Sequence, residues 1–275
     1  IEGKNSYVGI EAVGNNTVVN IYDDAEIYQK GTSSYVGAIV GASYNATMNI
    51  YGGYGKSAKC GIIVMSTGAT INVSGGEWIA NNDGTVAGGN QGVLVSQNNR
   101  YESGWACKSV LNVTGGTFKG GYDCWGSGPG VEADDAQINI KGGNFNADPT
   151  KYVVAGYEVT GNDNYTVAKP QALVALETAI ANGGNVTLTN DVTLLEALKI
   201  EKGVTIDLNG KTLKYVGTSK ASVINVAVGA SFTLTDCKEN ETVGYIDPTD
   251  GLFHEGVYTA GEAVEVILKG GVITG

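Results

Sequence analysis

Few residues of this chain have the types and spacing that acid–base catalysis requires. Asp134 and Asp135 form a carboxylate pair, and two carboxylates held about 5–9 Å apart hydrolyse glycosides in many enzymes. Adjacent residues of a strand face opposite sides, however, and the segment 132–136 leads into a turn, which favours a solvated corner. The only histidine is His254, and the only arginine is Arg100. We therefore expect no catalytic activity, with a site of unrecognised type as the alternative.

Three predicted turns carry clusters of oxygen ligands: Asn81-Asn-Asp-Gly84, Asn162-Asp-Asn164 and Asp247-Pro-Thr-Asp250. Hard cations such as Ca²⁺ take carboxylate and amide oxygens from tight turns. None of the three completes a calcium-loop pattern, and turns rich in Asn and Asp are common without metal. The favoured interpretation is that the protein binds no cofactor, and bound Ca²⁺ is the alternative.

Aromatic residues gather in two segments of the repeat described below: 97–107, where one repeat is lengthened, and 121–128 in the next repeat. These segments contain Tyr101, Trp105, Tyr122 and Trp125 together with Arg100. Exposed rings cover the apolar faces of sugars, while neighbouring polar groups bond the hydroxyls, so this set predicts a glycan-binding site. The alternative is that the rings cover the edge of the core and pack on one another.

The cysteines are Cys60, Cys107, Cys124 and Cys237, and none forms a C-x-x-C pair. With a single histidine, a Cys/His zinc site is not expected. Cys107 and Cys124 lie in the two aromatic segments, one repeat apart, so a disulfide between them is geometrically conceivable, although four cysteines do not fix a pairing. Cys60 precedes an apolar strand and is expected in the core as a thiol.

An internal repeat determines which elements position these residues. Ile71-Asn-Val-Ser-Gly-Gly-Glu-Trp78 recurs as Leu111-Asn-Val-Thr-Gly-Gly-Thr-Phe118 and as Ile138-Asn-Ile-Lys-Gly-Gly-Asn-Phe145. Weaker copies place further asparagines at 20 and 49, which gives intervals of 29, 23, 40 and 27 residues. A lone glycine opens another apolar segment before each copy, as at Gly37 and Gly61. Spacings of this size are typical of solenoids.

The alternation within each copy has the period of a strand. Three short strands per repeat, joined by glycine corners, predict an all-β fold: a right-handed parallel β-helix with three strands per rung. Equivalent residues of successive rungs then stack about 4.8 Å apart. We expect the flanking apolar residues to point inward, and the glycine pairs to allow positive φ and close approach between rungs. The asparagines are expected to form an amide ladder, and a sugar-binding surface is the alternative for this row.

The repeat pattern stops and resumes once, near residue 168. A polar segment follows Phe145, and the only convincing helix runs from Pro170 to a stop at Gly183-Gly184. Strand patterns then resume, from Val186 to the last Gly-Gly copy at 270–271. We expect two tandem β-helical segments, 1–168 with a C-terminal cap and 169–275 with an N-terminal capping helix. The last rung stops abruptly at Gly275, so we expect the native polypeptide to continue.

Composition excludes several classes of protein. The 275 residues include 42 Gly and 4 Pro, 42% are hydrophobic, and the net charge is −11. This is the composition of a folded chain with glycines at special backbone positions, not of a disordered or collagen-like one. An acidic chain without a Lys/Arg stripe is not expected to bind nucleic acid, and no apolar run is long enough for membrane insertion.

Two longer segments carry a family resemblance: Gly-Gly-x-Phe-x-x-Asp-Pro-x-x-Tyr-Val-x-x-Gly-Tyr-x-Val at 142–159, and 173–213 with Gly-x-Thr-Ile-Asp-Leu-Asn-Gly-Lys-Thr-Leu. They resemble modular surface proteins of gut bacteria built on the pectate-lyase-like β-helix. The resemblance implies an extracellular or cell-surface protein, such as an adhesin, whose partner is a polysaccharide or another surface glycan. Two alternatives remain: a polysaccharide lyase or glycoside hydrolase, and a phage fibre or spike that engages host glycans. The motifs of pectate lyases and polygalacturonases are missing from the sequence.

Overall fold

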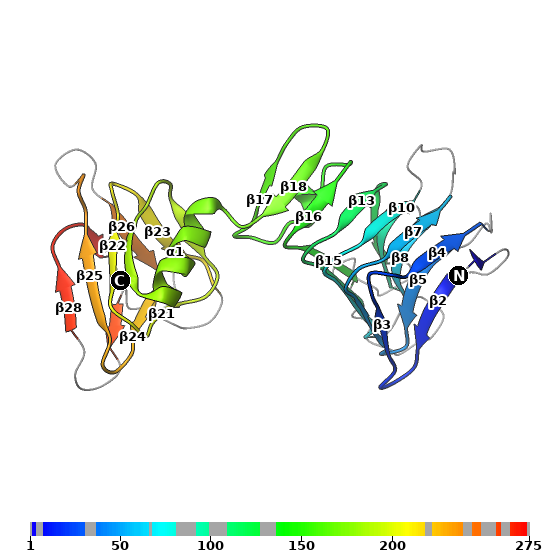
Figure 1. The fold of residues 1–275 in the computed structure, drawn as a ribbon, viewed down its shortest axis with the longest axis horizontal. Coiled ribbons are helices and arrows are strands. Elements are labelled where there is room, and N and C mark those ends of the chain that lie inside the picture. The colour runs from blue at the N-terminus through cyan, green and yellow to red at the C-terminus, as the bar shows by residue number, and fades with distance from the viewer. Residues whose placement is uncertain are drawn as a thin grey trace. The chain divides into compact units, whose positions relative to one another are not determined.

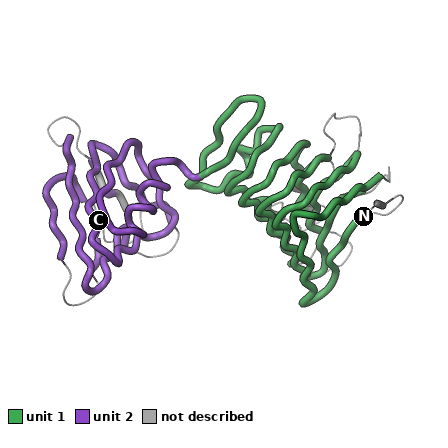
Figure 2. The backbone as a smooth tube through the Cα atoms, viewed as in Figure 1, with its two compact units in different colours: residues 1–168 green, residues 169–275 purple. Residues whose placement is uncertain are grey.

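A computed structural model describes residues 2–3, 8–30, 37–65, 68–80, 92–98, 109–126, 136–217, 222–238, 244–248, 257–259 and 265–273. The chain divides into two compact units, unit 1 (Ile1–Ala168) and unit 2 (Lys169–Gly275). Figure 2 colours them separately. Both are built from short parallel strands, and the described residues contain a single α-helix, α1 (Gln171–Asn182). The expected all-β class is confirmed.

Unit 1 consists of three parallel sheets that the chain enters in turn (Figure 1). Sheet A contains β1 (Glu2–Gly3), β4 (Glu26–Gln29), β7 (Tyr54–Ser57), β10 (Glu77–Ala80), β13 (Thr117–Lys119) and β16 (Gly143–Phe145). Sheet B contains β2 (Val8–Val13), β5 (Ala38–Ser43), β8 (Cys60–Met65), β11 (Gly92–Asn98) and β14 (Tyr122–Gly126). Sheet C contains β3 (Val18–Ile21), β6 (Thr47–Ile50), β9 (Thr70–Val73), β12 (Ser109–Val113) and β15 (Ala136–Ile140).

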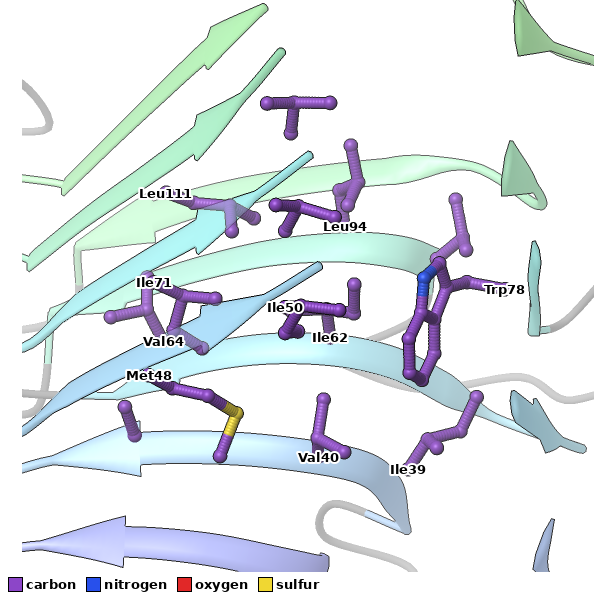
Figure 3. Packing of buried hydrophobic residues seen from close by; sticks show 14 of the residues in the cluster. Ile39, Val40, Met48, Ile50, Ile62, Val64, Ile71, Trp78, Leu94 and Leu111 are labelled. Carbon is purple, nitrogen blue, oxygen red and sulfur yellow. The ribbon is translucent and has the colours of Figure 1, made fainter. Parts of the chain in front are cut away.

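The apolar-Asn-apolar motif forms the strands of sheet C in one continuous register. Asn20, Asn49, Asn72, Asn112 and Asn139 stand opposite one another in successive strands. The apolar residues on either side of each asparagine point inward, and from the second strand onward they are buried, as at Ile71 and Val73. Figure 3 shows these side chains packed between the sheets. A residue period of two and a fixed register thus create both the core and the polar row outside it.

Sheet A supplies the largest side chain of this core. Trp78 is fully buried and lies in register with Gly55 of the preceding strand and Phe118 of the following one. A Cβ on Gly55 would collide with the indole ring, so the missing side chain makes the space that Trp78 fills. Phe118 in turn stacks on Phe145, with ring centroids 5.1 Å apart.

The two glycines of each Gly-Gly pair have different tasks, as the pair 75–76 illustrates. A Cβ on Gly75 would meet the carbonyl oxygen of Tyr51 in the preceding repeat, so this glycine permits close approach. Gly76 has a φ of 91°, in the left-handed region that other residues rarely adopt. Both predicted functions of the pairs are confirmed.

A hairpin that the sequence analysis did not predict closes the end of unit 1. Strands β17 (Glu158–Thr160) and β18 (Tyr165–Ala168) pair antiparallel, and β18 adds to β16 at the edge of sheet A. A 3-10 turn (Thr150–Tyr152) precedes it, and Val153 bridges to Ile140 at the edge of sheet C. These additions cover strand edges that would otherwise be open to pairing.

Unit 2 begins with α1, the predicted helix, which packs against the first strand of each following sheet. Its Leu173 and Leu176 are buried, and it ends at Gly183, whose φ is 74°. The first sheet contains β19 (Gly184–Thr187), β22 (Val204–Asp207), β25 (Ser231–Thr235) and β28 (Glu265–Leu268). The second contains β20 (Val192–Leu194), β23 (Thr212–Tyr215), β26 (Tyr245–Pro248) and β29 (Val272–Ile273), and the third β21 (Leu198–Ile200), β24 (Ile224–Val226) and β27 (Val257–Thr259). Its buried core, around Phe232 and Tyr215, is separate from that of unit 1.

Candidate functional site

The predicted glycan site lies largely outside the described residues. Arg100, Tyr101 and Trp105 belong to the segment 99–108, which the structure does not describe. The strands that lead into this region are described. β11 and β14 are adjacent and parallel, with Gln97 opposite Trp125 and Asn98 opposite Gly126. The segments that follow the two strands, at 99–108 and from 127 onward, therefore start from neighbouring strand ends on one side of sheet B.

Tyr122 and Trp125 were expected in a loop, and this is wrong: both belong to strand β14. Tyr122 is also not an exposed sugar platform. Its hydroxyl donates to the carbonyl oxygen of Ala147 at 2.8 Å, and its ring packs edge-on against Phe145 and Tyr152. Burial, followed by the charge of Asp148, raises the pKa of Tyr122. These contacts match the alternative in which the ring covers the edge of the core.

The cysteine predictions have different outcomes. Cys124 lies in β14 opposite Ser96, whereas Cys107 is outside the described residues, so their disulfide stays a prediction. Cys60 is buried, but in a small second cluster with Ala38, Ile63 and Val95, apart from the main core. The lone-glycine segment before the copy at 138–145, Gly130-Val-Glu-Ala133, lies outside the described residues. The last strand of sheet B is instead β14.

The cation and acid–base candidates gain no support. Asn162-Asp-Asn164 forms the turn between β17 and β18, and Asp247 lies in strand β26 rather than in a turn. Asn81–Gly84, Asp134, Asp135 and His254 are outside the described residues. Within the described part of the chain, no group of three or more His, Cys, Asp or Glu residues could hold a metal ion.

The outer face of sheet C carries the most regular polar arrangement in the described residues. Each asparagine amide donates to the Oδ1 of the asparagine in the preceding strand, at 3.0, 3.0, 3.0 and 3.1 Å from Asn49 to Asn139. The predicted amide ladder is therefore confirmed. A shared hydrogen-bonded row fixes the side chains in one orientation, because each amide acts as both donor and acceptor.

Two tyrosines that the sequence analysis did not single out stand at one end of this face. Tyr22 and Tyr51 each lie two residues after a ladder asparagine, and their rings stack with centroids 5.2 Å apart and planes 18° apart. They are 62% and 49% exposed. The signal was present in the sequence: Asn20-Ile-Tyr22 and Asn49-Ile-Tyr51 share one spacing within the repeat.

Comparison of the chain with protein-family models, with curated proteins and with solved structures found no match. Among the described residues, no helix has the length and apolar character needed to cross a membrane.

Proposed function

We propose that the chain is a non-enzymatic, extracellular or cell-surface protein that binds polysaccharide or another surface glycan. We further propose that each unit is a right-handed parallel β-helix. Strand order supports this architecture, since successive strands enter three sheets in turn and return one position further along. The four amide bonds from Asn20 to Asn139 and the glycine corners are what stacked, equivalent rungs require.

The observation that carries the glycan-binding proposal is the pairing of β11 with β14. It puts Trp125 beside Gln97 and brings the start of the segment with Arg100, Tyr101 and Trp105 next to the end of β14. Residues next to the ends of strands in a rigid sheet are well placed for binding. Aromatic residues such as Tyr101 and Trp105 and amides such as Gln97 have the chemistry to stack on sugar rings and to bond sugar hydroxyls.

Binding of a polysaccharide panel to the wild-type protein and to a Trp105→Ala/Trp125→Ala variant tests the proposal. We expect the wild type to bind at least one glycan and the variant to bind it at least tenfold more weakly. Tyr258→Ala, which removes an exposed ring from unit 2, is the matched control and should bind as the wild type does. Unchanged binding by the double variant would refute a site at these segments.

The same incubations test the absence of catalysis. Reducing ends and unsaturated products are measured after prolonged incubation of each polysaccharide with the wild-type protein. We expect neither to increase above the protein-free control. Release of either product would contradict the non-enzymatic function.

A further inference from the structure

We propose that the Tyr22–Tyr51 stack and the asparagine row of sheet C form a second binding site, for a neutral glycan. The proposal rests on the glycan-binding function proposed above, and it concerns a different face, defined entirely by described residues. Three features support it: exposed rings, unused hydrogen-bonding capacity, and charge.

The rings are exposed and yet held in place. Tyr22 and Tyr51 follow Ile21 and Ile50, which are buried and paired in the register of sheet C, so their backbone positions are fixed. Each ring then packs on the other. Tyr51 N–H also donates to Ile21 O at 2.8 Å. Rings that are already ordered lose little entropy on binding, which favours ligand affinity.

The stacked rings of Tyr22 and Tyr51 form an aromatic column, and no third ring continues it in the next strand. Ser74 holds the next place in this row and Thr114 the one after it, and both are exposed. Their hydroxyls donate to backbone carbonyls, Ser74 Oγ to Ile50 O at 3.3 Å and Thr114 Oγ1 to Val73 O at 3.2 Å. Ser74 is too small to cover the ring of Tyr51, which fits the 49% exposure of that residue. A sugar ring stacked on Tyr51 would continue the column over these hydroxyls, whose lone pairs accept hydrogen bonds.

The asparagine row supplies matching polar groups. Each inner asparagine uses one N–H and one Oδ1 lone pair in the ladder, as Asn72 does between Asn49 and Asn112. A side-chain amide has two N–H donors and two acceptor lone pairs, so one of each remains for a ligand. Repeated at the strand spacing of about 4.8 Å, these groups form a regular array that suits a polymer with repeating hydroxyls.

The charges on and around the outer face of sheet C favour a neutral ligand. The outward positions of the sheet C strands, and those that follow each strand directly, are Val, Thr, Asn, Tyr, Ser or Gln, and only Lys141 at the far end is charged. Asp23 and Asp24 are exposed next to Tyr22. A Cβ on Gly52 would meet the Asp23 carboxylate, which therefore lies against the residue that follows Tyr51. With a net charge of −11 on the whole chain, a polyanionic glycan would be repelled.

Affinity electrophoresis of the full chain in gels containing a neutral β-glucan, xylan or galactomannan, or polyanionic polygalacturonate, tests the site. We expect at least one neutral polymer to bind the wild type, and Tyr22→Ala/Tyr51→Ala to weaken that binding about tenfold, because stacking on an aromatic ring is lost. Tyr22→Phe/Tyr51→Phe keeps the rings and should retain binding. Both rings are exposed, so circular dichroism and thermal melting should match the wild type.

A second variant tests the position of the sugar. Ser74→Tyr extends the aromatic column into the place proposed for the ligand, so it should weaken binding without lowering stability. Tyr258→Ala in unit 2 is the control for loss of an exposed ring.

The possible outcomes separate this site from the general function. If the wild type binds a neutral glycan and neither Tyr22→Ala/Tyr51→Ala nor Ser74→Tyr changes the affinity, the second site is refuted while the proposed function stands. Binding of polygalacturonate alone would overturn the assignment to neutral glycans. If the wild type binds no polymer of the panel, the proposed function fails, and the second site fails with it.

Discussion

In unit 1, asparagine amides bond to one another from strand to strand, whereas in unit 2 aspartate side chains bond the backbone at the corners. The Asn20–Asn139 row crosses the whole of sheet C. In unit 2, Asp207 Oδ1 accepts from the N–H groups of Asn209 and Cys237, at 3.0 and 2.9 Å. Asp236, only 7% exposed, accepts from Gly210, Lys238 and Gly244, the last at 2.6 Å.

The two units thus satisfy the hydrogen-bonding groups between stacked strands with different side chains. An amide row lies in the sheet face, is insensitive to pH and leaves donors and acceptors facing outward. A carboxylate that accepts hydrogen bonds from several backbone N–H groups faces the backbone, and few of its lone pairs remain for other partners. The amide row of unit 1 therefore leaves polar groups facing outward, whereas the aspartates of unit 2 stabilise its corners.

The largest expected effect is the loss of stability when a large side chain is removed from either of the two cores. Trp78→Ala should destabilise unit 1 by about 3–5 kcal/mol, because it empties the space over Gly55. Phe232→Ala, also at a fully buried position, should do the same to unit 2 by a similar amount. Residue-resolved hydrogen exchange should show lost protection only in the unit that carries the substitution. Equal loss in both units would contradict two separate cores.

Acid should affect unit 2 through Asp236. Burial alone would raise its pKa, but the hydrogen bonds from Gly244, Gly210 and Lys238 outweigh burial and lower the pKa below 3.8. The ionised form is therefore favoured in the folded state, and its stabilisation is complete above the unfolded pKa and is lost as pH falls through the folded pKa.

Asp236→Asn tests this effect at two pH values. It should destabilise unit 2 by about 1–3 kcal/mol at pH 7, because an amide nitrogen cannot accept the bond from Gly244. The difference from wild type should be smaller at the acidic pH, because protonation of the wild-type carboxyl removes the same charge that the substitution removes. Urea unfolding followed by circular dichroism measures both values. A difference that is independent of pH would exclude the carboxylate as the cause.

If the asparagines form a ladder, the stability cost of replacing one of them depends on its place in the row. Asn72→Leu removes two ladder bonds and should cost about 1–2 kcal/mol, whereas Asn139→Leu at the end removes one and should cost about half as much. All three tryptophans belong to unit 1, so urea unfolding followed by tryptophan fluorescence reports on this unit. Thr233→Val, on an outward position of unit 2, is the control. Equal costs at positions 72 and 139 would argue against a ladder.

The smallest expected effect is at alkaline pH in unit 1. Burial and the charge of Asp148 raise the pKa of Tyr122 above 10.0, so the folded state favours the protonated phenol. Unit 1 should keep its stability up to about pH 10 and lose it as pH rises further, between the unfolded and folded pKa values. Tyr122→Phe should cost about 1 kcal/mol at pH 8 through the bond to Ala147, and should reduce the loss between pH 8 and 11. An unchanged alkaline loss would assign it to other groups.

The sequence was sufficient wherever one residue type recurs at one register position. The Ile-Asn-Val-Ser-Gly-Gly copies predict sheet C, the amide ladder and both functions of the glycine pairs, because each depends on local spacing. The helix that begins at Gln171 could also be predicted, from the spacing of its apolar residues and from the glycines that end it.

Features that depend on what a strand packs against could not be predicted in the same way. Trp78 is buried because Gly55 in the previous repeat lacks a side chain, which pairs residues far apart in the sequence. Tyr122 was expected in a loop because it lies one repeat after the segment that lengthens the repeat, whereas pairing with β11 makes it a strand residue. The β17–β18 hairpin was missed although Val159, Tyr165 and Val167 alternate around a turn at 161–164.

A glycan titration of the uniformly labelled full chain, followed by residue-resolved NMR, tests the difference between the units most directly. With a neutral oligosaccharide of a polymer that binds, we expect shift changes in unit 1 only, including the side-chain amides of Asn49 and Asn72 and the rings of Tyr22 and Tyr51. Shift changes in unit 2, or none in unit 1 at saturating oligosaccharide, would contradict the account.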